Sequence, residues 1–221
     1  MGSPTVRSVR WEDHFDRAQV LSTTPGHNGW TIKDTSSAGT PTYLGTSGAG
    51  LKLTMANNSE AEIVTLFQND VLQVPLSSLE YVAWVLKIAG WDANTQLVAG
   101  VASAQADAAD DITNNAWFLL TGATPAAFAE TDDGTTDLDD KSAGGATGAG
   151  WVRYEIDFTA GLSNIKFKKD GQDVATTTTF SMAAAAGNNV QPFLQLQKAS
   201  GTGVGTVSIR LFEMQYSIQL I

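Results

Sequence analysis

The chain has 221 residues, of which 43% are hydrophobic and 16% are charged, and its formal net charge is −10. This composition excludes a wholly disordered protein, and the length suits a single all-β domain. The absence of Cys excludes disulfides, thiolate metal sites and Cys nucleophiles. Because the N-terminus lacks the apolar segment of a signal peptide and no apolar run is long enough to span a membrane, we expect a protein that is made in a cytoplasm and has no membrane partner.

The negative charge is concentrated in one stretch of the chain. Residues 88–140 contain ten acidic residues and no Lys or Arg, whereas the rest of the chain has 13 acidic and 13 basic residues. Since nucleic acids select basic surfaces, this distribution argues against a nucleic-acid partner. We expect solvated acidic loops and no cofactor. Calcium is the alternative, because Asp107–Asp111 and Asp132–Asp140 supply carboxylates, but Lys141 interrupts the EF-hand spacing.

Residues 1–10 precede the first apolar motif of the chain. They include Pro4, Arg7 and Arg10 and contain no acidic residue. Terminal residues without an apolar pattern are commonly extended and outside the core. We therefore expect an N-terminal arm over residues 1–10 and one β-sandwich domain over residues 11–221.

Apolar patterns then predict strands in most of the chain. Residues 51–55 alternate between apolar and polar side chains. Four later segments are more continuously apolar, as expected of central strands covered on both faces, and they are residues 62–68, 81–89, 96–104 and 116–121.

The clearest strand signal is in residues 151–158, where every second side chain is apolar. After it, Asp170-Gly171 separates two further strand-like segments, 165–168 and 174–179. Asp-Gly is typical of the tight turn of a β-hairpin, so this region predicts a hairpin. Near the C-terminus the apolar face changes phase after Leu211, which predicts a β-bulge.

Clusters of Gly, Ser, Thr and Pro separate these segments at the spacing of an antiparallel sandwich. Only residues 183–186 favour a short helical turn, and no linker divides the chain. The predicted fold class is therefore all-β, with two packed antiparallel sheets in a jelly-roll arrangement.

The order of several motifs resembles that of a concanavalin A-like, laminin-G-type jelly roll. The similarity covers residues 11–218, and the order of the elements carries it more than any single motif. The motifs are Glu12-Asp13-His14-Phe15-Asp16, Gly29-Trp30, the strand Leu51–Met55, Trp151-x-x-Tyr154-x-Ile156, Ile165-x-Phe167-x-x-Asp170-Gly171, Pro192-Phe193-Leu194-x-Leu196 and Val207-x-Ile209. This resemblance implies a fold and does not imply a chemistry.

A chain of this kind with a basic N-terminal arm and strands rich in Ala, Gly and Thr also looks like tailed-phage virion proteins, in particular capsid decoration or cement proteins. That resemblance implies a structural protein of the virion. It would bind the major capsid protein, or another virion protein, on the outside of the head as a homo-oligomer, which we expect to be a trimer. Its alternatives are a lectin-like carbohydrate-binding module and a receptor-binding protein of the tail or fibre.

Three groups of residues were considered for catalysis, and none predicts an enzyme. Concanavalin A-like glycanases carry the pattern E-x-D-x-E or E-x-D-x-x-E on one strand, and the nearest approach here is Glu130-x-Asp132, which lacks the third carboxylate. Glu155 and Asp157 share a strand face that is typical of a solvated surface. The two His residues lack the spacing of a zinc site.

The carbohydrate-binding alternative has its own candidate residues. Trp91 lies in a predicted hairpin loop with Asp92 and Asn94, where an aromatic ring could stack on a sugar and the polar groups could bind its hydroxyls. The interpretation that we favour for Trp91 is that it covers the end of the core or a neighbouring subunit. Four other Trp residues are expected in or near the core, and they are Trp11, Trp30, Trp84 and Trp117.

The role as a structural protein, which is the main expectation, places an interface at the two ends of the chain. Arg7 and Arg10 of the arm would pair with an acidic neighbour, and the C-terminus stays apolar through Ile218, Leu220 and Ile221. Such an end either completes a central strand or contacts another subunit.

Overall fold

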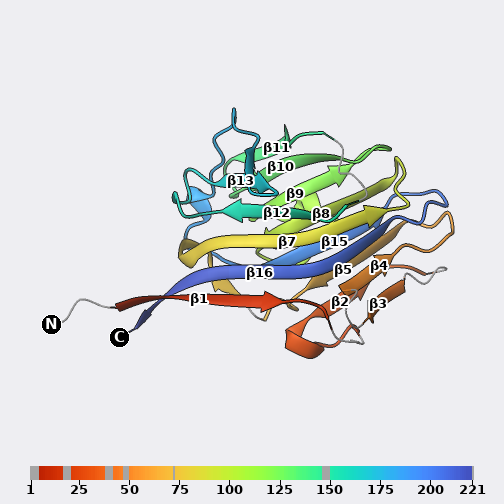
Figure 1. Cartoon of the computed structure of the whole chain (residues 1–221), viewed down its shortest axis with the longest axis horizontal. Coiled ribbons are helices and arrows are strands. Elements are labelled where there is room, and N and C mark those ends of the chain that lie inside the picture. The colour runs from red at the N-terminus through yellow and green to blue at the C-terminus, as the bar shows by residue number, and fades with distance from the viewer. Residues whose placement is uncertain are drawn as a thin grey trace.

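The computed structural model describes residues 5–16, 21–37, 42–46, 50–71, 73–145 and 150–220. Two antiparallel sheets pack face to face (Figure 1). This confirms the predicted all-β sandwich. Four short 3-10 turns lie in the connections of the described residues, and they are η1 (His27–Gly29), η2 (Leu76–Ser78), η3 (Ala109–Asp111) and η4 (Ala183–Ala185).

Sheet A contains both ends of the described chain. Its strand order is β14 (Gln172–Val174), β13 (Lys166–Lys169), β12 (Val152–Asp157), β7 (Leu79–Ala89), β16 (Thr206–Leu220), β4 (Gly50–Thr54) and β3 (Thr42–Thr46), and β1 (Thr5–Asp13) also pairs with β16.

Sheet B contains three of the four segments that are more continuously apolar in the sequence, and the fourth, residues 81–89, lies in β7 of sheet A. Its strand order is β11 (Asp137–Ser142), β10 (Ala126–Asp132), β9 (Asn115–Thr121), β8 (Thr95–Ala102), β15 (Asn189–Lys198), β5 (Glu62–Phe67) and β2 (Thr31–Asp34), and β6 (Val74–Pro75) also pairs with β15.

Alternate residues of both sheets meet between them in the main core. Trp30 directly precedes β2 of sheet B, and Trp84 and Phe212 come from sheet A. Their rings pack together, with the centroids of Trp84 and Phe212 4.7 Å apart. Trp30 and Trp84 are 0% and 1% exposed, which confirms that they are core residues. The Nε1 of Trp84 donates to the backbone oxygen of Gly100, so sheet A is also hydrogen-bonded to sheet B.

The hairpin predicted at Asp170-Gly171 is confirmed. β13 and β14 pair through this turn, and both turn residues have positive φ, 49° and 78°, as a type I′ turn requires. The second strand is shorter than expected, because β14 ends at Val174 and Ala175 adopts a φ of 52°. The Thr residues at 176–179 therefore lie in a loop.

The predicted bulge near the C-terminus is confirmed in β16. Its register against β7 shifts between Ile209 and Leu211, which places the extra residue at Arg210. The shift lets Ile209 and Phe212, three residues apart, both point into the core, where each is 0% exposed.

Residues 5–10 do not form the extended arm that we expected. They are the first part of β1, which pairs with β16 from Thr5 opposite Leu220 to Asp13 opposite Phe212 (Figure 1). The reason is that the second half of β16 offers an edge beyond β4, and Trp11 anchors β1 by packing on the rings of Trp30 and Phe212.

The residues predicted to form an interface lie on this two-stranded ribbon. Arg10 is already paired with Glu12 and with the buried Glu213 of β16, so it is engaged within the chain. Arg7 is exposed, and Ile218 is 38% exposed. The side chain of Leu220 and all of Ile221 lie outside the described residues. Self-association through the ribbon stays a prediction.

Candidate functional site

A polar groove crosses the outer face of sheet B. It consists of two adjoining hollows of about 270 and 310 Å³ that share Gln96 and Gln197. We call their union the groove. The first hollow is lined by Ala61, Ile63, Ala93, Asn94, Gln96, Gln197, Lys198 and Ala199, and the second by Gln96, Val98, Ala109, Asp110, Leu119, Thr121, Glu130, Asp139, Asp140 and Gln197.

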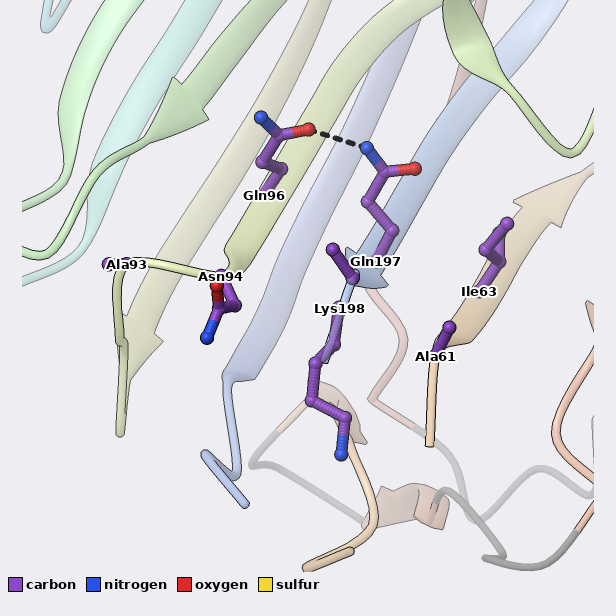
Figure 2. A pocket seen from close by; sticks show the side chains of 8 residues that line it. Ala61, Ile63, Ala93, Asn94, Gln96, Gln197 and Lys198 are labelled. Carbon is purple, nitrogen blue, oxygen red and sulfur yellow. Dashed lines mark hydrogen bonds between the residues drawn. The ribbon is translucent and has the colours of Figure 1, made fainter. Parts of the chain in front are cut away.

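The centre of the groove is a pair of amide side chains. Gln96 of β8 and Gln197 of β15 are opposite each other in the sheet register and both point away from the core. The Nε2 of Gln197 donates to the Oε1 of Gln96 at 2.5 Å (Figure 2). Within the part of the chain that the structure describes, Gln96 Nε2 and Gln197 Oε1 have no hydrogen-bond partner. One donor and one acceptor are thus held in fixed positions for a ligand.

The loop 103–114 packs on part of this face and forms one wall of the groove. Its Ala109 and Ile112 are buried in a second apolar cluster with Phe67, Trp117 and Phe193 of the sheet. The Nε2 of Gln195 donates to the backbone oxygen of residue 106 at 2.8 Å. Trp117 is therefore buried, as expected, but under this loop and not in the main core.

The other end of the groove is acidic. The Glu130 side chain of β10 accepts hydrogen bonds from Trp117 Nε1 at 2.6 Å and from the backbone N–H of Asp140 at 3.2 Å. Glu130 is 5% exposed, and burial raises the pKa of its carboxyl to about 7. Burial also raises the pKa of Asp110 and of Asp139, and their mutual repulsion and that of neighbouring Asp residues adds to the effect.

Of the three residues predicted to contact a glycan, one lines the groove. Asn94 lies at its rim (Figure 2). Trp91 packs against the main core, and its Nε1 is buried without a partner in the described residues. Asp92 accepts hydrogen bonds from the Asn94 N–H and the Thr95 hydroxyl, at 2.9 and 2.8 Å, which fixes the turn before β8.

The two carboxylate pairs that the sequence offers for catalysis lie on different sheets, Glu130 and Asp132 on β10 of sheet B and Glu155 and Asp157 on β12 of sheet A. Asp132 Oδ1 accepts the N–H of Gly134 in a turn at 2.8 Å. Glu155 and Asp157 lie on sheet A, where their nearest basic groups are Arg153 at 2.9 Å and Lys168 at 2.6 Å, respectively.

Among the described residues, no three acidic, His or Cys side chains are grouped so as to hold a metal ion. The acidic loop residue Asp107 pairs with Lys33 at 2.7 Å, and Asp133 accepts the N–H groups of two loops. Calcium binding stays a prediction. In the same described part of the chain, no helix has the length and apolar character needed to cross a membrane.

Sequence reasoning missed the groove itself. Gln96 begins the segment 96–104, which was interpreted as covered on both faces, and Gln197 follows the motif Pro192-Phe193-Leu194-x-Leu196. In β15 the polar side chains of Gln195 and Gln197 alternate with the apolar side chains of Leu194 and Leu196. That alternation was a usable signal. The pairing across 101 residues was not visible in the sequence.

Comparison with known proteins gives a fold and no family. No family model matches the chain, and no curated protein matches it. Among solved structures, the carbohydrate recognition domain of Emp47p is similar with 11% identity and a TM-score of 0.58, covering 90% of this chain and 93% of that one.

Two mycobacterial structures are similar over nearly the whole chain. A β-1,3-glucanase from Mycobacterium marinum has 11% identity and a TM-score of 0.57, covering 94% of this chain and 97% of its own. Rv0315 of Mycobacterium tuberculosis, described as a pseudo β-1,3-glucanase, has 12% identity and a TM-score of 0.58, with 94% and 98% covered. The chain therefore has the concanavalin-like β-sandwich fold that these lectin-type and glucanase-type proteins share.

Proposed function

We propose that this protein is a carbohydrate-binding module that holds its ligand in the groove on the outer face of sheet B. The observation that carries the proposal is the fixed amide pair Gln96–Gln197 beside the apolar side chains of Val98 and Leu119. Amides bind sugar hydroxyls, and apolar side chains cover the C–H faces of a sugar ring. The recognition domain and the glucanase-type proteins of the same fold support this proposal.

The negative charge of the groove indicates which class of glycan it can bind. Asp110, Glu130, Asp139 and Asp140 line one end. The basic residue that lines the other end is Lys198, and its ammonium group is directed into the protein and is 0% exposed. We therefore propose neutral or amino-containing glycans as ligands, because a sulfate or carboxylate would be repelled.

The first prediction concerns the amide pair. The double variant Gln96→Ala, Gln197→Ala should weaken binding of a neutral oligosaccharide by about tenfold or more, because two hydrogen-bonding side chains are lost from the site. A glycan array would supply the oligosaccharide, and calorimetry would measure the affinity.

A matched control is Gln172→Ala, which removes an exposed Gln from β14 of sheet A. It should leave the affinity unchanged. Wild-type affinity in the folded double variant would place binding outside the groove. If the protein bound no glycan on the array, the proposed carbohydrate-binding function would be wrong.

Binding without hydrolysis and a role on a virion, both expected from the sequence, stay proposals. We propose that the groove binds without hydrolysis, since Asp132 is engaged in its turn and the third carboxylate of the glycanase pattern is absent from β10. The role as a virion decoration protein rests on the sequence resemblance alone, because none of the three similar structures reported above is described as a virion protein.

A further inference from the structure

Lys198 is a charged residue buried at the end of the sandwich. It is the last residue of β15 and lies opposite Glu62 of β5, and both side chains are 0% exposed. Its Nζ donates to the backbone oxygens of Ala56 and Asn58, each at 2.7 Å, and Asn58 Oδ1 lies at 3.4 Å. Glu62 Oε2 is 3.7 Å away.

These oxygens surround the ammonium group as they would surround a small cation. Two are backbone oxygens of the loop between β4 and β5, one is a side-chain amide oxygen and one is a carboxylate oxygen. Glu62 Oε2 also accepts the N–H of Ala56 at 2.9 Å. Both residues of the ion pair, Lys198 and Glu62, are therefore hydrogen-bonded to the loop. The other oxygen, Glu62 Oε1, is buried and has no hydrogen-bond partner in the described residues.

This arrangement is adjacent to the groove. The loop held by the ammonium ends at Ala61, and Ala61 and Ile63 line the first hollow together with Lys198 and Ala199 (Figure 2). A buried ion pair is a weak source of stability, because desolvation opposes the attraction of the charges. Its contacts here join the end of β15, and Glu62 at the start of β5, to the backbone of Ala56 and Asn58 in the loop.

We infer that Lys198 acts as a tethered cation that orders the loop 56–61 and so positions one wall of the groove. Lys198 is thus a positioning residue for the ligand, and this part of the inference rests on the proposed function. If the ammonium is removed, the same oxygens form a site for a free monovalent cation, with Glu62 supplying the negative charge.

The test is Lys198→Ala in the full chain, followed by hydrogen exchange of the amides of residues 55–62. Exchange there should become about tenfold faster, because the loop opens locally while the sheets stay protected. Methylammonium or potassium chloride should restore protection, and tetramethylammonium chloride at equal ionic strength should not, because that ion is too large for the vacated space. Lys87→Ala, on an exposed position of β7, is the matched control and should change neither property.

A second variant covers the risk that a lone buried carboxylate prevents folding. Lys198→Met with Glu62→Gln removes both charges and keeps their approximate volumes, so it should fold with a mobile loop that no cation rescues. Unchanged exchange at 55–62 in this variant would overturn the inference, as would a loosened loop in Lys198→Ala that neither methylammonium nor potassium restores.

The hydrogen-exchange measurement needs no glycan, so it tests the effect of Lys198 on the loop even if the protein binds no glycan. For a glycan that the wild type binds, affinity should fall in Lys198→Ala and return with methylammonium. Full affinity together with a loosened loop would contradict the positioning role and leave the groove proposal intact.

Discussion

Gly100→Ala should destabilise the protein by about 3 kcal/mol, near the upper end of what overpacking a core costs. A Cβ on Gly100 of β8 would lie 2.1 Å from the backbone oxygen of Ala116 and 2.6 Å from Cα of Trp117, both on β9. Backbone atoms in the middle of a sheet cannot move aside as the end of a side chain can. Denaturant unfolding measures the change.

The position of Gly100 also affects the groove. The missing side chain of Gly100 lets β8 and β9 approach closely beneath Trp117. The indole Nε1–H of Trp117 donates a hydrogen bond to the Glu130 carboxylate in the groove. Gly187→Ala is the control, because Gly187 has no atoms within 4 Å of an added Cβ, and its stability should be unchanged or slightly raised. Equal stabilities of Gly100→Ala and wild type would mean that β8 and β9 are not packed as described.

The second large effect is a pH dependence that originates at Glu130. Its carboxyl has a pKa of about 7 in the folded protein against 4.5 for an unperturbed Glu, because burial disfavours the charged form. The folded state therefore binds this proton more tightly than the unfolded state. The resulting stabilisation is complete below pH 4.5 and is lost as the pH rises through 7, and it amounts to about 3 kcal/mol.

Glu130→Gln isolates this contribution. Other carboxyl groups of the chain titrate in the same range, so the quantity to measure is the difference in unfolding free energy between wild type and variant at each pH. Relative to the variant, the wild type should lose stability between about pH 4.5 and 7. The Nε1–H resonance of Trp117, which donates to Glu130, should titrate with a midpoint near 7 in the wild type. Parallel stability profiles, with the Trp117 resonance titrating near 4.5, would show that burial does not raise the pKa of Glu130.

The sequence predicted the parts of the fold that depend on local patterns. Alternation in residues 151–158 identified β12, and Asp170-Gly171 identified the hairpin, because a type I′ turn needs positive φ at both residues. The phase change in β16 identified its bulge.

What the sequence did not reveal depends on contacts between distant segments. β1 resembled an arm because its partner, residues 212–220 of β16, lies about 200 residues away in the sequence. Gln96 and Gln197 become a site only when β8 and β15 are neighbours, and Lys198 meets its loop only through the β15–β5 pairing. Trp91 was a candidate ligand-binding residue because it is an aromatic residue in a predicted loop. Its packing against the core becomes visible only when the two sheets are packed together.

The central claim is that a glycan occupies the outer face of sheet B, and an NMR titration tests it most directly. A neutral oligosaccharide added to labelled protein should shift the side-chain amide resonances of Gln96 and Gln197 and the backbone resonances of β8, β9 and β15 beside the groove. The indole resonance of Trp91, packed against the core, should stay in place. Shifts confined to sheet A or to the Trp91 loop, with Gln96 and Gln197 unaffected, would contradict the account.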